Sequence, residues 1–125
     1  MDQTAPEPLA LRERMSAALT GAMKARDQVT VAALRSTLGA LANAEAVGVG
    51  TPVTGAGSRD VAGSSLGVGS SEAVRRSLAG RETADLVLTE AVEREEAARG
   101  YDAAGQPARA ERLRAEATVI RSFLP

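Results

Sequence analysis

The chain has 125 residues, 44% of them hydrophobic, and a formal charge of −1 at pH 7. This size fits one domain, residues 1–125, with a modest core, and the balanced charge gives no overall attraction to nucleic acid. Cysteine and histidine are both absent, which excludes disulfides, Cys–His and Ser–His–Asp catalysis, and zinc sites of the usual kind. The aromatic residues are only Tyr101 and Phe123, so the core must come from Leu, Val, Ala and Met, as in closely packed helices.

Two apolar stripes predict two helices in the first part of the chain. The prolines at positions 6 and 8 suit a first helical turn, and the first helix should run to about Arg26. The second stripe is out of phase with the first by nearly half a turn, so one straight helix would place the stripes on opposite faces. We therefore predict a break at residues 26–28, with Asp27 as the N-cap of the second helix. The stripes are Leu11, Met15, Ala18, Leu19, Ala22 and Met23, then Val31, Leu34, Leu38, Leu41 and Ala42.

A glycine-rich segment follows the second helix, which should end within residues 45–47. Seven glycines occur in residues 48–69, among Ser, Thr and Val. Such a composition favours a flexible, disordered linker, which we place at residues 48–73. Its Gly-x-Gly pieces lack the Gly-Lys-Ser/Thr of a phosphate loop and follow no strand. Residues 74–78 should then approach the bundle in an extended form, and the third helix should begin within residues 80–83.

Residues 84–124 predict two antiparallel helices joined by a bend at residues 104–107. Gly105 can adopt the left-handed conformation that ends a helix, and Pro107 has its φ fixed for the first turn of the next one. Each arm carries one apolar stripe, with Tyr101 assigned to the core. The stripes are Ala84, Val87, Leu88, Ala91, Ala98 and Tyr101, then Leu113, Ala117, Ile120 and Leu124. The expected fold class is therefore all-α: a small bundle of about four helices, arranged as two helical hairpins joined by the linker.

One charged residue interrupts each stripe of the hairpin, Arg94 in the first arm and Glu116 in the second. Arg94 precedes the bend by about as many residues as Glu116 follows it, and antiparallel helices of equal rise place such positions at equal height. We therefore predict a structural pair across the hairpin, which would fix register more than it adds net stability. The alternative is that both residues lie at the edge of the stripe with their charged ends in water.

Charge is distributed unevenly along the hairpin. Residues 81–104 hold three cations and seven anions, a net of −4, whereas residues 107–124 hold four cations and two anions, a net of +2. The two arms should therefore attract each other. For any single charged residue, a solvated helix face is the simpler interpretation.

Several short patterns occur in a characteristic order over about residues 9–46 and 74–125. They are Ala22-Met23-Lys24-Ala25-Arg26-Asp27; Leu34-Arg35 followed by Leu38, Leu41 and Asn43-Ala44-Glu45; and Glu93-Arg94-Glu95 through Tyr101, Ala104-Gly105, Glu116 and Phe123-Leu124-Pro125. In these patterns the chain resembles the bacterial-type YqeY-like (GatB/YqeY) family. The same domain forms the carboxyl-terminal part of GatB, a component of the glutamyl/aspartyl-tRNA amidotransferase. The Gly-rich insert is similar to the variable connection of shorter members.

The resemblance implies an all-helical fold and an association with tRNA-dependent amidation. In that reaction, a carbon–nitrogen ligation, misacylated Glu-tRNA or Asp-tRNA becomes Gln-tRNA or Asn-tRNA with glutamine as the nitrogen donor. The kinase-like catalytic part of GatB is separate and has no match here, and the YqeY-like tail helps to hold the tRNA. Many members also continue past the Leu-Pro into a further small helical unit that these 125 residues do not include. The resemblance thus implies a non-catalytic accessory or adaptor without a cofactor, with tRNA or an aminoacyl-tRNA amidotransferase as its partner.

Contacts to a tRNA backbone would need cations along one face, and arginine can bridge two phosphate oxygens. The candidates for RNA or partner contact are Lys24, Arg26 and Arg35 near the first bend, and Arg109, Arg112 and Arg121 on the last helix. With Tyr101 in the core, no aromatic ring would be left for base stacking, so binding should be weak and salt-dependent. The alternative is a helical protein-interaction module or homodimer with no RNA role, and the sequence does not separate the two.

Independent catalysis is the third hypothesis, and Glu90, Glu93 or Glu116 could in principle serve as an acid or base. Their spacing assembles no second carboxylate, nucleophile or metal ligand around them, so we expect no catalytic residue, cofactor or metal. Residues 1–9 contain acids and two prolines rather than a basic start and an apolar run, and no segment approaches a membrane span. A cytoplasmic protein is the expectation.

Overall fold

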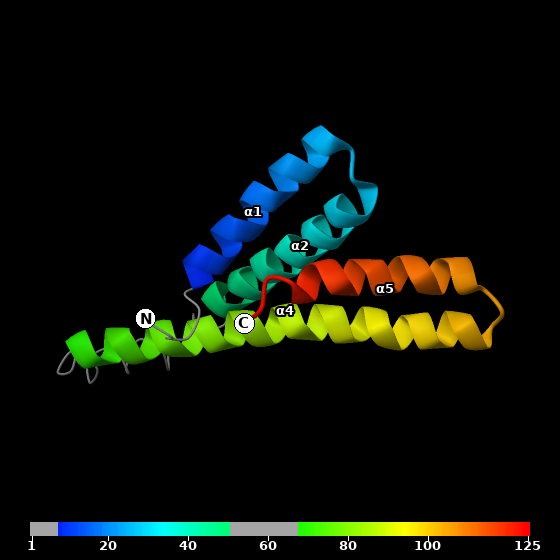
Figure 1. The fold of residues 1–125 in the computed structure, drawn as a ribbon. Coiled ribbons are helices and arrows are strands. Elements are labelled where there is room, and N and C mark those ends of the chain that lie inside the picture. Colours follow the sequence, from blue (N-terminus) through cyan, green and yellow to red (C-terminus); the bar gives the residue numbers. More distant parts are fainter. Residues whose placement is uncertain (1–7, 51–67) are drawn as a thin grey trace.

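The computed structural model describes residues 8–50 and 68–125, and the regular structure in these two ranges is entirely helical. The helices are α1 (Pro8–Ala25), α2 (Gln28–Gly50), α4 (Val68–Ala103) and α5 (Pro107–Arg121). Helices α1 and α2 form one antiparallel hairpin, and α4 and α5 form the other (Figure 1). The expected small all-α bundle of two helical hairpins is therefore confirmed.

The turn between α1 and α2 lies where the sequence predicts a break. The Arg26 N–H donates to the carbonyl of Met23 at 3.2 Å, and the Asp27 N–H donates to that of Ala22 at 2.9 Å. This pair of bonds is a Schellman motif, whose central residue takes a left-handed conformation. That residue is Arg26, with φ 60°, which explains why no glycine marks the break. Asp27 then caps α2, because its Oδ1 accepts from the Thr30 N–H at 3.2 Å.

The turn between α4 and α5 uses the same motif with the expected glycine. The Gln106 N–H donates to the carbonyl of Tyr101 at 2.8 Å, and the Gly105 N–H donates to that of Asp102 at 3.0 Å. Gly105 has φ 76°, a conformation that costs glycine little. Pro107 then opens α5. The two hairpins are thus closed by equivalent turns.

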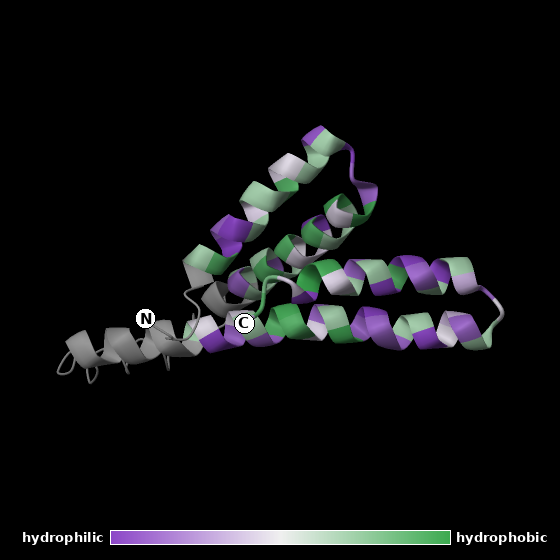
Figure 2. Ribbon diagram, viewed as in Figure 1, coloured by the Kyte–Doolittle hydropathy of each residue, from purple (hydrophilic) through white to green (hydrophobic). Residues whose placement is uncertain are grey.

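The hairpins meet at their open ends and diverge toward their bends (Figure 1). In Figure 2 the most hydrophobic parts of α4 and α5 lie beside α2, and hydrophilic residues increase toward the α4–α5 bend. The core accordingly takes residues from all four described helices. Its buried members are Leu11, Met15, Ala33, Leu34, Leu41, Val87, Ala91, Ala117 and Ile120.

Some residues assigned to the apolar stripes are not buried. Leu88 is 38% exposed while its neighbour Val87 is fully buried, so the inner face of α4 is centred one position away from the expected one. Met23 is 48% exposed, because it lies near the bend, where α1 diverges from the other hairpin (Figure 1). Ala42 is also exposed, and Tyr101 is only half-buried.

The boundaries around the glycine-rich segment also differ from expectation. Helix α2 continues to Gly50 rather than ending within residues 45–47, and α4 begins at Val68 rather than within residues 80–83. Residues 74–78 are therefore helical and not an extended approach. No glycine or proline occurs in residues 70–79, and Gly80 is buried within α4, where it does not end the helix. Of the predicted linker, residues 48–50 and 68–73 are helical and residues 51–67 lie outside the described part of the chain.

The carboxyl-terminal segment packs back across the open end of the bundle. Phe123 and Leu124 lie against the core. The Arg14 side chain of α1 donates from Nη2 to the Phe123 carbonyl at 3.0 Å, and its Cζ lies 5.8 Å from the centre of the Phe123 ring. Arg12 of α1 also pairs with Glu45 of α2. The Arg14 contacts join the two hairpins at the end where they share a core, whereas the Arg12–Glu45 pair joins α1 to α2 within one hairpin.

Candidate functional site

Arg94 and Glu116 meet across the α4–α5 hairpin, as their equal heights predict. The Arg94 Nε donates to Glu116 Oε1 at 3.0 Å. The Arg94 Nη1 also donates to the carboxylate and to the backbone carbonyl of Glu90, both at 3.0 Å. The two side chains are only 13% and 11% exposed, so their charged ends are not free in water. The interpretation as a pair across the hairpin is the one that the structure supports.

Glu116 has a second cationic partner, which completes a short network. Its Oε2 accepts from Arg112 Nε at 3.4 Å, one helical turn earlier on α5. The order is therefore Glu90, Arg94, Glu116, Arg112, with alternating charge. Such a balanced, largely buried network specifies the register of two helices, since a shift along either helix would strand a charge.

More exposed ion pairs also join α5 to α4. Arg121 donates to both carboxylate oxygens of Glu95 at 2.7 and 2.9 Å, and Arg114 Nη1 donates to Asp102 Oδ2 at 2.8 Å. The hydrogen bond from Arg121 lowers the pKa of Glu95, and the same contact raises the pKa of Arg121. The hydrogen bond to Asp102 raises the pKa of Arg114. These contacts provide the attraction that the opposite net charges of the two arms predict.

Three of the candidate cations gather at the α1–α2 bend. Lys24 lies in the last turn of α1, Arg26 is the left-handed residue of the turn, and all three are exposed. Arg35 of α2 reaches back to α1, where its Nη2 lies 4.0 Å from the sulfur of Met23. Within the described ranges, none of the three makes an ion pair or a hydrogen bond to an oxygen atom.

The carboxylate at this bend, Asp27, is engaged in capping α2. Its Oδ2 accepts from the Thr30 hydroxyl at 2.7 Å and its Oδ1 accepts from the Thr30 N–H. These two hydrogen bonds, the side-chain one first, lower the pKa of Asp27. The carboxylate therefore stays charged and turned to the helix end, while Lys24, Arg26 and Arg35 present their charges to solvent.

The three candidates on α5 are in a different situation, because two of them are paired within the hairpin. Arg121 binds Glu95, and Arg112 contacts Glu116. Arg109 instead lies over the ring of Tyr101, with its Cζ 5.7 Å from the ring centre. The structure therefore does not bring the six candidates together on one surface.

Tyr101 occupies a surface hollow rather than the core to which the sequence analysis assigned it. Beyond Ala98, α5 is the one described helix that covers α4, because the α1–α2 hairpin diverges (Figure 1). The hollow has a volume of about 390 Å³ and is lined by Tyr101, Ala108, Arg109, Arg112 and Leu113. Residues equally far from the bend lie at equal height, which is how Arg94 was paired with Glu116. Tyr101 and Arg109 are also equally far from Gly105, so the sequence could have predicted this contact as well.

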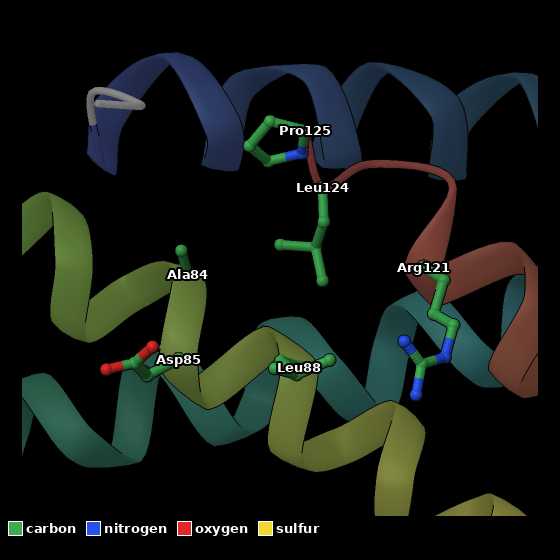
Figure 3. Close-up of a pocket in the computed structure, with 6 residues that line it drawn as sticks. All are labelled: Ala84, Asp85, Leu88, Arg121, Leu124 and Pro125. Atoms are coloured by element: carbon green, nitrogen blue, oxygen red, sulfur yellow. The ribbon is translucent and has the colours of Figure 1, made fainter. Parts of the chain in front are cut away.

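A second hollow, of about 380 Å³, lies at the open end of the bundle (Figure 3). Ala84, Asp85 and Leu88 line it from α4, and Leu124 points into it from the carboxyl-terminal segment (Figure 3). Arg121 lies at its edge and is already bound to Glu95. The exposed Leu88 is therefore partly sheltered by Leu124.

Two of the three carboxylates considered for catalysis are engaged in ion pairs within the α4–α5 hairpin. Glu90 and Glu116 both bind Arg94, while Glu93 is exposed on α4. Among the residues that the structure describes, no three acidic side chains lie close enough together to hold a metal ion.

Comparison of the chain with family models, curated proteins and solved structures finds no match. Across residues 8–50 and 68–125, no helix has both the length and the apolar character needed to cross a membrane.

Two surfaces carry candidate ligand-binding residues. They are the cations at the α1–α2 bend and the hollow beside the α4–α5 bend.

Proposed function

We propose that the chain is a non-catalytic helical adaptor in tRNA-dependent amidation that contacts the tRNA backbone through Lys24, Arg26 and Arg35. The observation that carries the proposal is the gathering of these three exposed cations at the α1–α2 bend, without an anionic partner among the described residues. The same segments, around Lys24 to Asp27 and around Arg35, are among those in which the sequence resembles the YqeY-like family.

The backbone of Arg26 supports this use of the bend. A left-handed conformation costs a residue with a side chain about 1–2 kcal/mol, and glycine is the usual choice there. Arg26 adopts this conformation with φ 60° and makes no ion pair with a described residue. Arg26 therefore places a charged side chain at the tip of the turn, where the usual glycine would place none.

The bend is also shaped for contact with an extended anionic backbone. It projects away from the other hairpin (Figure 1), so a large ligand can approach it without meeting α4 or α5. Three cations neutralise at most three phosphates, so the binding constant should fall with a log–log salt slope of roughly −2 to −3. Binding by this surface should therefore be weak at physiological salt.

The test is titration with unfractionated tRNA at two salt concentrations. We expect Lys24→Gln/Arg35→Gln to weaken low-salt binding by about tenfold or more, because two charge-assisted phosphate contacts are lost. The matched control is Arg81→Gln/Arg99→Gln, which removes the same charge from exposed positions of α4 and should change binding little. An absence of tRNA binding at low salt, or equal loss in both variants, would overturn the backbone contact. Turnover of glutamine by the isolated chain would overturn the non-catalytic role.

The alternative is a protein-interaction module or homodimer with no RNA role, and the exposure of Leu88 is the observation that favours it. Sedimentation equilibrium distinguishes the two. A concentration-dependent dimer that Leu88→Lys abolishes, in a chain that does not bind tRNA, would favour the alternative.

A further inference from the structure

The hollow beside the α4–α5 bend combines a flat apolar wall with cationic groups. Tyr101 and Leu113 are half-buried and form its apolar part together with Ala108. Arg109 and Arg112 add two guanidinium groups from the first two turns of α5. Its volume of about 390 Å³ lies in the lower part of the range for small-molecule sites.

The guanidinium groups retain much of their hydrogen-bonding capacity. Among the contacts of the described residues, Arg112 uses only Nε, which lies 3.4 Å from Glu116 Oε2; the other oxygen of Glu116 is bound by Arg94. Arg109 makes no ion pair with any described residue. The other carboxylates near the bend, Asp102 and Glu111, both contact Arg114. An anion entering the hollow would therefore meet unused N–H donors on both guanidinium groups, with Glu116 engaging one nitrogen of Arg112.

The contact between Arg109 and Tyr101 is loose enough to be rearranged. At 5.7 Å from the ring centre, the guanidinium is near the outer limit of a cation–π contact, and such contacts are weak at exposed sites. A planar ring could stack on Tyr101 in its place, or stack on the guanidinium itself. The hollow therefore fits a ligand that joins a planar ring to an anionic group.

We propose that this hollow binds a nucleotide, with its base stacked on Tyr101 and Arg109 and its phosphate bound by Arg112 and Arg109. The nucleotide can be free or can be an unpaired position of an RNA strand, because both offer a base and a phosphate. The proposal is independent of the proposed function, since that function depends on the cations at the other bend.

The chain contains a single tyrosine and no tryptophan, so a spectroscopic signal from tyrosine reports on this site alone. With fluorotyrosine at position 101, the ¹⁹F spectrum has one resonance, and titration with adenosine 5′-monophosphate should shift it saturably. Adenosine and inorganic phosphate, each tested alone, should bind at least about tenfold more weakly, because each lacks one of the two contacts. A single-stranded hexanucleotide that binds more tightly than the mononucleotide would identify RNA as the source, and equal affinity would identify free nucleotides; either result supports the site.

Three variants separate binding from folding. Arg109→Gln should weaken binding of the mononucleotide about tenfold, whereas Arg81→Gln, on the same helix as Tyr101 but about 30 Å away along it, should not change it. Tyr101→Leu, checked for helix content by circular dichroism, should abolish the binding measured by calorimetry. The proposal is overturned if the mononucleotide does not shift the resonance, if phosphate or a hexa-aspartate peptide binds as well as the nucleotide, or if Arg81→Gln weakens binding as much as Arg109→Gln.

Discussion

Arg94 is the residue whose environment says most about how the α4–α5 hairpin is specified. It lies between two carboxylates, those of Glu90 and Glu116, and each is 3.0 Å from a guanidinium nitrogen. Glu116 in turn lies between Arg94 and Arg112. Removing either central residue leaves an incompletely paired charge in a place that water reaches poorly.

We expect Arg94→Met or Glu116→Leu to lower the free energy of unfolding by about 3 kcal/mol, because each leaves the opposite charge largely buried. The double variant should lose less than the sum of the two by about 1–3 kcal/mol, since neither charge of the pair is then stranded. Urea denaturation of the four proteins in this cycle measures the difference. Additive losses would show that the two side chains do not interact in solution.

The pairing of Arg94 with Glu116 could be predicted from residue counts on either side of the bend, but burial could not. Tyr101 shows why. Its spacing on the α4 stripe is that of a core residue, yet it lies half-exposed because the other hairpin does not extend that far. Helical periodicity gives the face on which a residue lies, whereas burial depends on how far along the helix a neighbour reaches.

At the scale of the elements, the two turns of the molecule allow a direct comparison. Both are Schellman motifs, and the left-handed residue is Arg26 in one and Gly105 in the other. The bend at Gly105 and Pro107 could be predicted from the residue types at those positions. The bend at Arg26 could be predicted only from the phase change between two apolar stripes.

Exchanging the residue types at these turns should change stability in opposite directions. We expect Arg26→Gly to raise the free energy of unfolding by about 1 kcal/mol, because it relieves the left-handed strain of a residue with a Cβ. Gly105→Ala should lower it by about 1 kcal/mol for the same reason. A Cβ at Gly105 meets no atom within 4 Å, so the loss reflects backbone conformation and not a clash. Thermal or urea denaturation measures both changes.

Gly100→Ala is the matched control for Gly105→Ala. Gly100 also has open space around its Cβ position, but it lies within α4 and has no positive φ. Alanine should stabilise that position by about 0.4–1 kcal/mol. If both alanine variants were stabilising, the turn at Gly105 would not require a left-handed residue.

The residue at which α4 begins could not be predicted from composition alone. A segment rich in Gly and Ser was expected to continue to residue 73 and to be followed by an extended approach, but α4 begins at Val68. The helix passes through Gly80, which is buried. Glycine lowers helix propensity by only about 1 kcal/mol, and tertiary packing can offset a cost of that size. Compositional boundaries therefore locate helix ends less reliably than turn motifs do.

At the scale of the whole molecule, the shared core and the diverging bends divide the structure into two kinds of region. The core joins all four described helices at the open ends of the hairpins, whereas the bends project separately (Figure 1). The two candidate binding surfaces lie at these bends. The shared core therefore lies away from most of the residues proposed to bind ligands. Arg112 is the exception, because it also contacts Glu116 in the network that sets the register of the α4–α5 hairpin.

This arrangement predicts that a core change on one hairpin destabilises the other. Leu34 of α2 is fully buried and packs in the same cluster as Ala117 and Ile120 of α5. Leu34→Ala should lower the free energy of unfolding by about 2–5 kcal/mol. Native-state hydrogen exchange should then accelerate equally at the amides of α2 and at those around Ile120, because both open only with the common core. Leu88→Ala, at an exposed leucine of α4, should cost less than about 1 kcal/mol. If Leu34→Ala accelerated exchange in α1 and α2 alone, the hairpins would be separate cooperative units and the shared core would contribute little to holding them together.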